Sequence, residues 1–266
     1  MLTVYPFHRC GSQIAYCDEI DSQDGQVLFV MRVERAASAA LALDLEAITL
    51  RPSCSGAGNP SMNTQQSLRE ERANTWSAAF GMLGSIAFAL ILLWRGDASA
   101  GQWIFATALL GLFLTSTIYH GLASERAKEV ARILDHCAIF VLIAGTYTPF
   151  ALGPLRDHGG LMLFTLEWLL TLIGVLFVLC GGLNRLRASN ALYIGMGWMG
   201  LFFTTGFLTN VSPIGNGLIL AGGLIYTAGV GFYSARGWRY SHLVWHLFVI
   251  AGSTCHAVAV YAYSGR

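Results

Sequence analysis

The chain has 266 residues, of which 55% are hydrophobic and only 12% charged, and its formal net charge is +1. A soluble domain usually carries about 25% charged residues, so this composition argues against an ordinary soluble protein. The near-neutral balance also excludes a nucleic-acid-binding function based on bulk positive charge. The six cysteines form no CxxC pair, so we expect neither a disulfide framework nor a thiolate metal site.

Residues 1–69 differ in composition from the rest of the chain. Short apolar pieces alternate with polar stretches that contain glycine and serine, and "RPSCSGAGNPSMN" is typical of a linker. We see no basic segment followed by a short apolar core, so we expect no signal peptide here. We expect a poorly ordered or weakly structured extension, with a small cytoplasmic cap as the alternative. Met62 is a candidate natural start of the protein.

Residues 70–266 are predicted to form a membrane domain. A transmembrane helix needs roughly 20 predominantly apolar residues, and a helix closes its backbone hydrogen bonds within one segment. Segments that meet this requirement are residues 76–94, 103–120, 133–152, 160–180, 190–209, 215–232 and 242–263. The sequence therefore predicts an all-α polytopic membrane protein with seven transmembrane helices, in preference to a soluble helical bundle.

Basic residues between the predicted spans fall unevenly on the two sides of the membrane. One set of loops carries seven of them, namely Arg126, Lys128, Arg132, Arg185, Arg187, Arg236 and Arg239. The opposite set carries three: Arg95, Arg156 and Arg266. The richer set is expected in the cytoplasm. This orientation predicts a cytoplasmic N-terminus and an external C-terminus.

Polar residues within three of the predicted spans fall at one membrane depth. Ser116 and His120 stand at i and i+4 near the end of the second span, and His242 and His246 have the same spacing at the start of the seventh. Asp135 lies at the start of the third span. With the predicted orientation, all these residues lie near the cytoplasmic face. Polar groups in membrane helices are costly and usually face a bundle interior or a cavity.

These residue types indicate a zinc site. Three neutral histidines and a water make an open tetrahedral zinc site, so His120, His242 and His246 are the expected ligands. Zinc would lower the pKa of its water to about 7. Asp135 would orient or deprotonate that water or hold a histidine ring, and Ser116 would bond a ligand or a developing oxyanion. The alternative is that each histidine makes only a hydrogen bond between helices.

Other polar residues of the spans do not join this cluster. His256 lies about 15 Å beyond His246 along the same helix and is expected to pack or to line a substrate cavity. His136 points about 100° away from Asp135 around its helix, so it is at most a neighbour of the site. Glu167 is expected to be a neutral carboxyl bonded to another helix, with a proton relay as the alternative.

Several motifs resemble a known family. They occur in order across residues 70–258: "EERANTWS", "STIYHGL", "RILDHCAIFVLIAGTYTPF", "ALYIGMGWMG" and "YSHLVWHLFVIAGSTCHAV". The chain resembles the hemolysin III family, bacterial relatives of the adiponectin and progestin receptors. The resemblance implies seven helices with the N-terminus inside, and a zinc site near the cytoplasmic face.

Carried over position by position, the resemblance implies His120, His242 and His246 as ligands, with Asp135 at the water and Ser116 beside it. The sequence departs from the family in the first span. There "ANTWSAAFG" has Ala78 where the family usually has a histidine. The departure removes no expected ligand, but it changes the surroundings of the site.

These observations lead to three functional hypotheses. The first is a zinc-dependent hydrolase of a lipid amide or ester in the bacterial inner membrane. The second is a pore-forming cytolysin, although an apolar seven-helix chain differs from a pore former that must first be soluble. The third is a lipid-binding receptor or membrane-stress sensor without turnover. Membrane lipid is the expected substrate or ligand in the first and third hypotheses.

Overall fold

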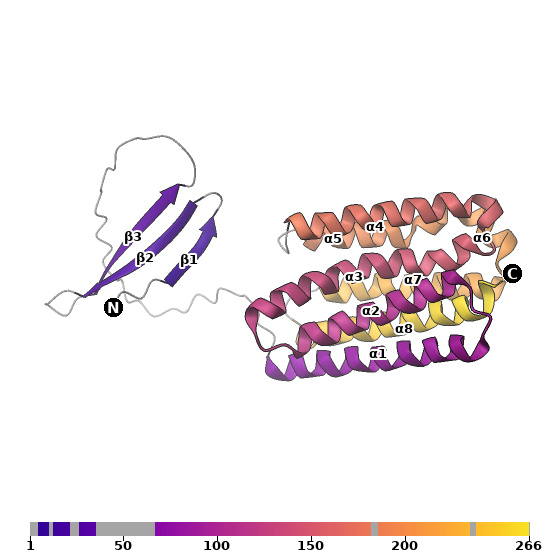
Figure 1. The fold of residues 1–266 in the computed structure, drawn as a ribbon, viewed down its shortest axis with the longest axis horizontal. Helices are drawn as coiled ribbons and strands as arrows, with labels where there is room; N and C mark the ends of the chain where they lie inside the picture. The colour runs from indigo at the N-terminus through magenta and orange to yellow at the C-terminus, as the bar shows by residue number, and fades with distance from the viewer. Residues whose placement is uncertain are drawn as a thin grey trace. The chain divides into compact units, whose positions relative to one another are not determined.

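The computed structural model describes residues 5–10, 13–21, 27–35, 67–181, 186–234 and 238–265. The chain divides into two compact units, Met1–Met62 and Asn63–Arg266. In the first unit, strands β1 (Tyr5–Cys10), β2 (Gln13–Asp21) and β3 (Val27–Arg35) form an antiparallel sheet in the order β1-β2-β3 (Figure 1). The sequence analysis did not predict these strands. The candidate start at Met62 lies outside the described residues.

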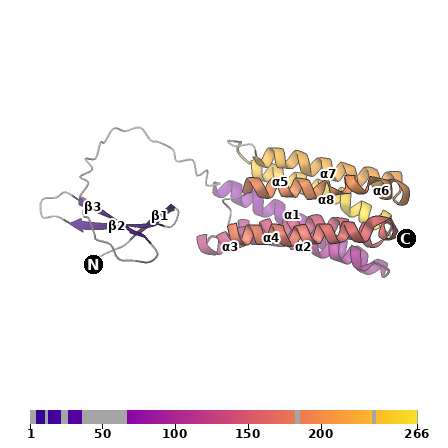
Figure 2. The same ribbon diagram turned by 90° about the horizontal axis from the view of Figure 1, so that it is seen from above.

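Within its described residues, the second unit is entirely helical (Figures 1 and 2). Its α-helices are α1 (Leu68–Arg95), α2 (Ala100–Gly121), α3 (Glu125–Leu152), α4 (Leu161–Gly181), α5 (Leu186–Gly197), α6 (Thr204–Asn210), α7 (Pro213–Ser234) and α8 (Ser241–Tyr263). A π-helical turn, η1 (Arg156–Gly160), precedes α4, and a 3-10 turn, η3 (Met199–Phe203), separates α5 from α6.

Capping residues fix where the first two helices begin. The Ser67 hydroxyl accepts a hydrogen bond from the Glu70 backbone, and the Glu70 carboxylate accepts one at 2.8 Å from the Ser67 N–H. Ser99 and Gln102 form the same reciprocal pair at the start of α2. Each pair satisfies backbone N–H groups that the first turn of a helix leaves free. Helix α1 ends at Gly96, whose φ of 75° suits glycine.

Six described helices are long and apolar enough to cross a membrane, namely Leu68–Arg95, Ala100–Gly121, Glu125–Leu152, Arg156–Cys180, Pro213–Ser234 and Ser241–Tyr263. Large apolar side chains such as Leu90, Leu172 and Leu224 are at least half exposed on them. Such surfaces suit contact with lipid. The helical unit is therefore that of an integral membrane protein, and six of the predicted spans coincide with these helices.

The predicted span at residues 190–209 is not a continuous helix. It is divided among α5, η3 and α6, so no single helix there has the length of a crossing. Tyr147 of α3 occupies the break: its hydroxyl donates to the Gly197 carbonyl at 2.6 Å and accepts from the Gly200 N–H at 3.1 Å. In a membrane, broken helices are tolerated where neighbouring groups satisfy the freed backbone.

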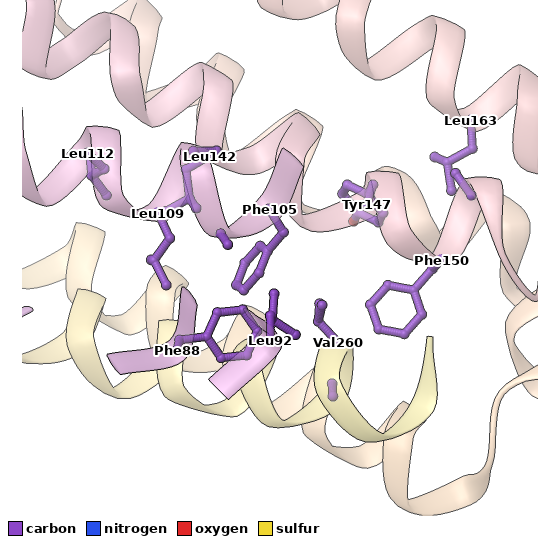
Figure 3. Packing of buried hydrophobic residues seen from close by; sticks show 14 of the residues in the cluster. Phe88, Leu92, Phe105, Leu109, Leu112, Leu142, Tyr147, Phe150, Leu163 and Val260 are labelled. Carbon is purple, nitrogen blue, oxygen red and sulfur yellow. The ribbon is translucent and has the colours of Figure 1, made fainter. Parts of the chain in front are cut away.

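The main hydrophobic core joins α1, α2, α3 and α8 (Figure 3). Phe88 and Phe105 meet edge to face with centroids 5.6 Å apart, beside Leu92 and Val260. Small residues let α2 and α3 approach closely. A Cβ at Gly101 would lie 2.7 Å from the Cα of Pro149. These contacts lie near the ends of α1, α3 and α8 and the start of α2, whereas the candidate site is built on the opposite ends of the same four helices.

Candidate metal site

Three histidine rings meet between α2 and α8. His120 comes from the last turn of α2, and His242 and His246 from the first two turns of α8. One nitrogen from each ring lies within 4.8 Å of the others. The Nε2 atoms of His120 and His242 are 3.0 Å apart, and the three ring centroids are 4.7 to 5.1 Å apart. The three side chains are close enough to hold one metal ion.

The outer nitrogen of His120 is held by an acidic residue. Nδ1 of His120 donates to the Glu71 carboxylate at 2.8 Å, and Lys128 donates to the other carboxylate oxygen at 2.7 Å. A carboxylate accepts, so the proton of the neutral ring lies on Nδ1, and Nε2 presents its lone pair toward His242. A carboxylate in this position orients a metal-binding histidine and raises its basicity. The sequence analysis did not single out Glu71.

A serine on α1 fixes the ring of His246 in the same way. The Ser77 hydroxyl donates to the Asn74 carbonyl at 2.9 Å and lies 2.8 Å from Nδ1 of His246. Because the one hydroxyl proton is engaged, Nδ1 is the donor in the second contact. The lone pair of His246 is then on Nε2. Ser77 immediately precedes Ala78, which is fully buried where the family usually has a histidine.

The two residues with expected catalytic roles also lie here. The Ser116 hydroxyl is 3.4 Å from Nε2 of His246. Asp135 of α3 is only 7% exposed and lines a small pocket together with His242. Ser116 therefore contacts the histidine cluster, and Asp135 lines the pocket beside it. The residues come from one end of the helical unit, where α1, α3 and α8 begin and α2 ends (Figure 1).

The remaining polar residues considered from the sequence lie outside this cluster. His136 lines the same small pocket as Asp135, but its Nδ1 donates to the Arg132 carbonyl at 2.9 Å. His256 lies deeper along α8 and lines a separate, larger cavity. Glu167 is completely buried on α4, and neither carboxyl oxygen has a hydrogen-bond partner within the described part of the chain. The structure therefore shows no bond from Glu167 to a neighbouring helix.

A largely apolar cavity of about 910 Å³, which includes the space at its mouth, adjoins the site. It extends among α3, α5, α7 and α8. Four residues line both this cavity and the small pocket that contains Asp135 and His242: Ile139, Tyr193, Val230 and Trp245. An elongated apolar ligand in the cavity would therefore have one end beside the histidines.

The donor set fits a divalent transition metal. Imidazole nitrogens suit zinc and its neighbours. The lone pairs of His120 and His246 are on Nε2 because Glu71 and Ser77 hold Nδ1. Two rings on one helix and one on another meet the requirement for three protein ligands with an open fourth position. The three histidines therefore form a candidate metal site.

The fold and this site define an integral membrane protein of helices with a candidate three-histidine metal centre. Residues 66–257 match the family model described as Haemolysin-III related. The chain therefore belongs to the hemolysin III family, as its motifs predicted.

Two bacterial relatives align with this chain over most of their own length. The chain is 34% identical over 202 residues to "Hemolysin-3 homolog" of Bacillus subtilis (strain 168), covering 74% of this chain and 95% of the relative. It is 35% identical over 194 residues to "Hemolysin-3" of Bacillus cereus, covering 71% and 89%. A human relative, "Monocyte to macrophage differentiation factor", is 27% identical over 212 residues, covering 74% and 85%.

Proposed function

We propose that the protein is a zinc-dependent hydrolase of a lipid amide or ester, located in the bacterial inner membrane. This proposal rests on one observation, that a candidate metal site and an apolar cavity lie side by side. A three-histidine cluster with oriented rings lies beside an apolar cavity, and both share lining residues with the pocket of Asp135. A bound zinc ion would supply a Lewis acid and an acidified water.

The residues around the cluster have defined roles in this proposal. A carboxylate oxygen of Asp135 takes the proton of the water as the water oxygen bonds to the acyl carbon, and returns it to the amine or alcohol that leaves when the amide or ester bond breaks. The Ser116 hydroxyl, which lies 3.4 Å from Nε2 of His246, donates to oxygen of the ligand. The apolar cavity binds the acyl chain and keeps bulk water from it. Glu71 and Ser77 hold His120 and His246 in the required tautomer.

The proposal includes a membrane topology. Residues 186–210 make a seventh, broken crossing, the N-terminus is cytoplasmic, and the histidine cluster lies near the cytoplasmic face. The support is the excess of basic residues on one set of loops and the bonding of the broken segment by Tyr147.

The test begins with the metal content of the purified full-length protein and its variants. Wild type should contain about one zinc per chain, because the site offers three ligands to one ion. His120→Ala, His242→Ala and His246→Ala should lose it, and His158→Ala, at an exposed histidine, should keep it. A wild-type protein without metal after gentle purification would refute the zinc proposal.

Activity is then measured on lipid amides and esters in mixed micelles. Asp135→Asn should keep zinc and lower turnover by about a hundredfold or more, the usual effect of losing a general base. Lipid binding without turnover in wild type would refute the hydrolase and favour a sensor.

The printed names of the Bacillus relatives make cytolysis the second candidate. Lysis of red cells that survives the histidine substitutions would favour a cytolysin instead.

A further inference from the structure

His256 is a buried polar residue in the apolar cavity with one unused nitrogen. Its ring is 6% exposed and lines the cavity. Nε2 lies 3.1 Å from the carbonyl oxygen of Ile219 on α7. A carbonyl oxygen can only accept, so Nε2 carries the proton of the neutral ring, and Nδ1 is an acceptor. Nδ1 is buried and has no hydrogen-bond partner among the described residues.

The hydroxyl groups that line the cavity differ from His256 because each is already engaged. Thr146 and Thr227 each donate to a carbonyl of their own helix. Tyr147 donates to the carbonyl of Gly197, and Tyr193 donates to that of His136. Tyr226 shares a hydrogen bond with Ser253. A buried acceptor left without a donor costs free energy, and such groups in native proteins usually have a partner. The nitrogen of His256 therefore points to a donor supplied by a ligand.

The surroundings hold the ring of His256 in a fixed place. Any Cβ at position 222 would collide with the imidazole, so the glycine there makes the space the ring occupies. The Tyr226 ring packs edge-on against it with centroids 5.2 Å apart. Both neighbours come from α7, as does the carbonyl of Ile219. This arrangement fixes the position of Nδ1 as well as its tautomer.

The position of His256 sets where the ligand must carry its donor. His256 follows His246 by ten residues on one continuous helix, which corresponds to about 15 Å along the axis. A lipid whose head lies at the histidine cluster would reach His256 with the middle of its acyl chain. A hydroxyl group is the smallest strong uncharged donor that an otherwise apolar chain can carry.

We propose that the cavity selects an acyl chain with a mid-chain hydroxyl, which donates a hydrogen bond to Nδ1 of His256. The placement of the lipid head rests on the proposed function, whereas the hydroxyl site rests on the cavity and on His256 themselves.

The test compares three probes that bind to the full-length protein in detergent micelles. They are octadecanoic acid, its derivative with one hydroxyl in the middle of the chain, and its derivative with the hydroxyl beside the carboxyl. The mid-chain derivative should bind about five- to tenfold more tightly than the plain acid, the effect of one buried hydrogen bond. The other derivative should show no gain. Equal affinities for all three acids, or no binding of any, would overturn the proposal.

Variants test whether the preference for the mid-chain hydroxyl depends on the imidazole of His256. His256→Phe keeps a ring of similar size and should bind all three acids equally. His256→Gln returns an acceptor oxygen and should recover part of the preference. Thr146→Val removes a cavity hydroxyl that is already bonded to Leu142, and it should keep the full preference. A preference that survives in folded His256→Phe would assign the hydroxyl to another partner and overturn the proposal.

His242→Ala separates this inference from the proposed function. It should lose metal and turnover but keep the preference for the mid-chain hydroxyl, because His256 lies far from the cluster. Metal and turnover without any preference in wild type would refute the hydroxyl site alone. A preference without metal or turnover in wild type would refute the hydrolase alone.

Discussion

Glu71 of α1 bonds side chains of two other helices at the candidate site. Its two carboxylate oxygens bond His120 of α2 and Lys128 of α3, while its own backbone belongs to α1. The carboxylate is therefore held from a second side while it orients the imidazole. Residues that hold the ligands of a metal in this way fix the orientation of the ligand rings and so contribute to metal affinity.

Substitution of Glu71 should weaken metal binding without removing a ligand. We expect Glu71→Ala to lower zinc affinity by about 10- to 100-fold, because the ring of His120 loses the acceptor that fixes its tautomer. The measurement is a competition titration with a chelator of known affinity. Glu129→Ala removes an equal charge from an exposed position of α3 and should bind zinc like wild type. Equal affinities for both variants would show that the carboxylate does not orient the ligand.

The sequence indicated the histidine cluster but not the residues that hold it. The spacing of His242 and His246 places both rings on one helix face whatever the tertiary structure. Their meeting with His120 followed from the predicted membrane depth. The contacts of Glu71 with His120 and of Ser77 with His246 could not be predicted from the sequence, because they depend on the rotation of α1 about its axis. Only the packing of α1 against α2 and α8 determines that rotation.

Among the helices, α2 and α3 depend on small residues for their close approach. Gly101→Ala should lower the free energy of unfolding by about 1–3 kcal/mol, because the new methyl group meets the backbone of Pro149, which has little room to move. Thermal unfolding in detergent measures the change.

Gly111 supplies a matched control on the same helix. No atom lies within 4 Å of a Cβ built at this position. Gly111→Ala should leave stability unchanged or raise it by about 1 kcal/mol, since alanine favours the helix. A loss at Gly111 equal to that at Gly101 would contradict the close-packing argument.

The break between α5 and α6 is stabilised by one hydroxyl group. Tyr147→Phe leaves the Gly197 carbonyl and the Gly200 N–H without that partner, so we expect a loss of about 1–3 kcal/mol. Thermal unfolding is compared with that of Thr165→Val, which removes an exposed hydroxyl bonded within its own helix. Should the two variants unfold at the same temperature, Tyr147 would have no special role at the break.

The length of the apolar segments predicted six helices well, because each of these helices is one uninterrupted apolar stretch of sequence. It could not predict that residues 190–209 are divided, since this segment has the length of a crossing and contains no charged residue. The break arises where glycines at positions 197 and 200 meet the hydroxyl of Tyr147, a contact about fifty residues away in the chain. The pairing of three strands in residues 5–35 was also missed, because short apolar pieces in a polar context gave no clear period.

For the whole molecule, the number of crossings decides the side on which the chain ends. If residues 186–210 cross the membrane, the two termini lie on opposite sides. We expect alkaline phosphatase, which is active only outside the cytoplasm, to be active when fused after the last residue. The same enzyme fused after Arg126, in the basic first turn of α3, should be inactive. An inactive C-terminal fusion of full length, with normal expression, would contradict the seventh crossing.

The three histidines of the candidate site come from α2 and from α8, the last of the described helices. A ribosome adds about 5–20 residues per second, so His120 enters the membrane seconds before His242 and His246 have been synthesised. Until the final segment has been inserted, the nascent protein has one of the three imidazoles and cannot form the complete site. Metal binding at all three histidines would therefore have to follow the insertion of α8, and any product that terminates before α8 lacks two of the three imidazoles.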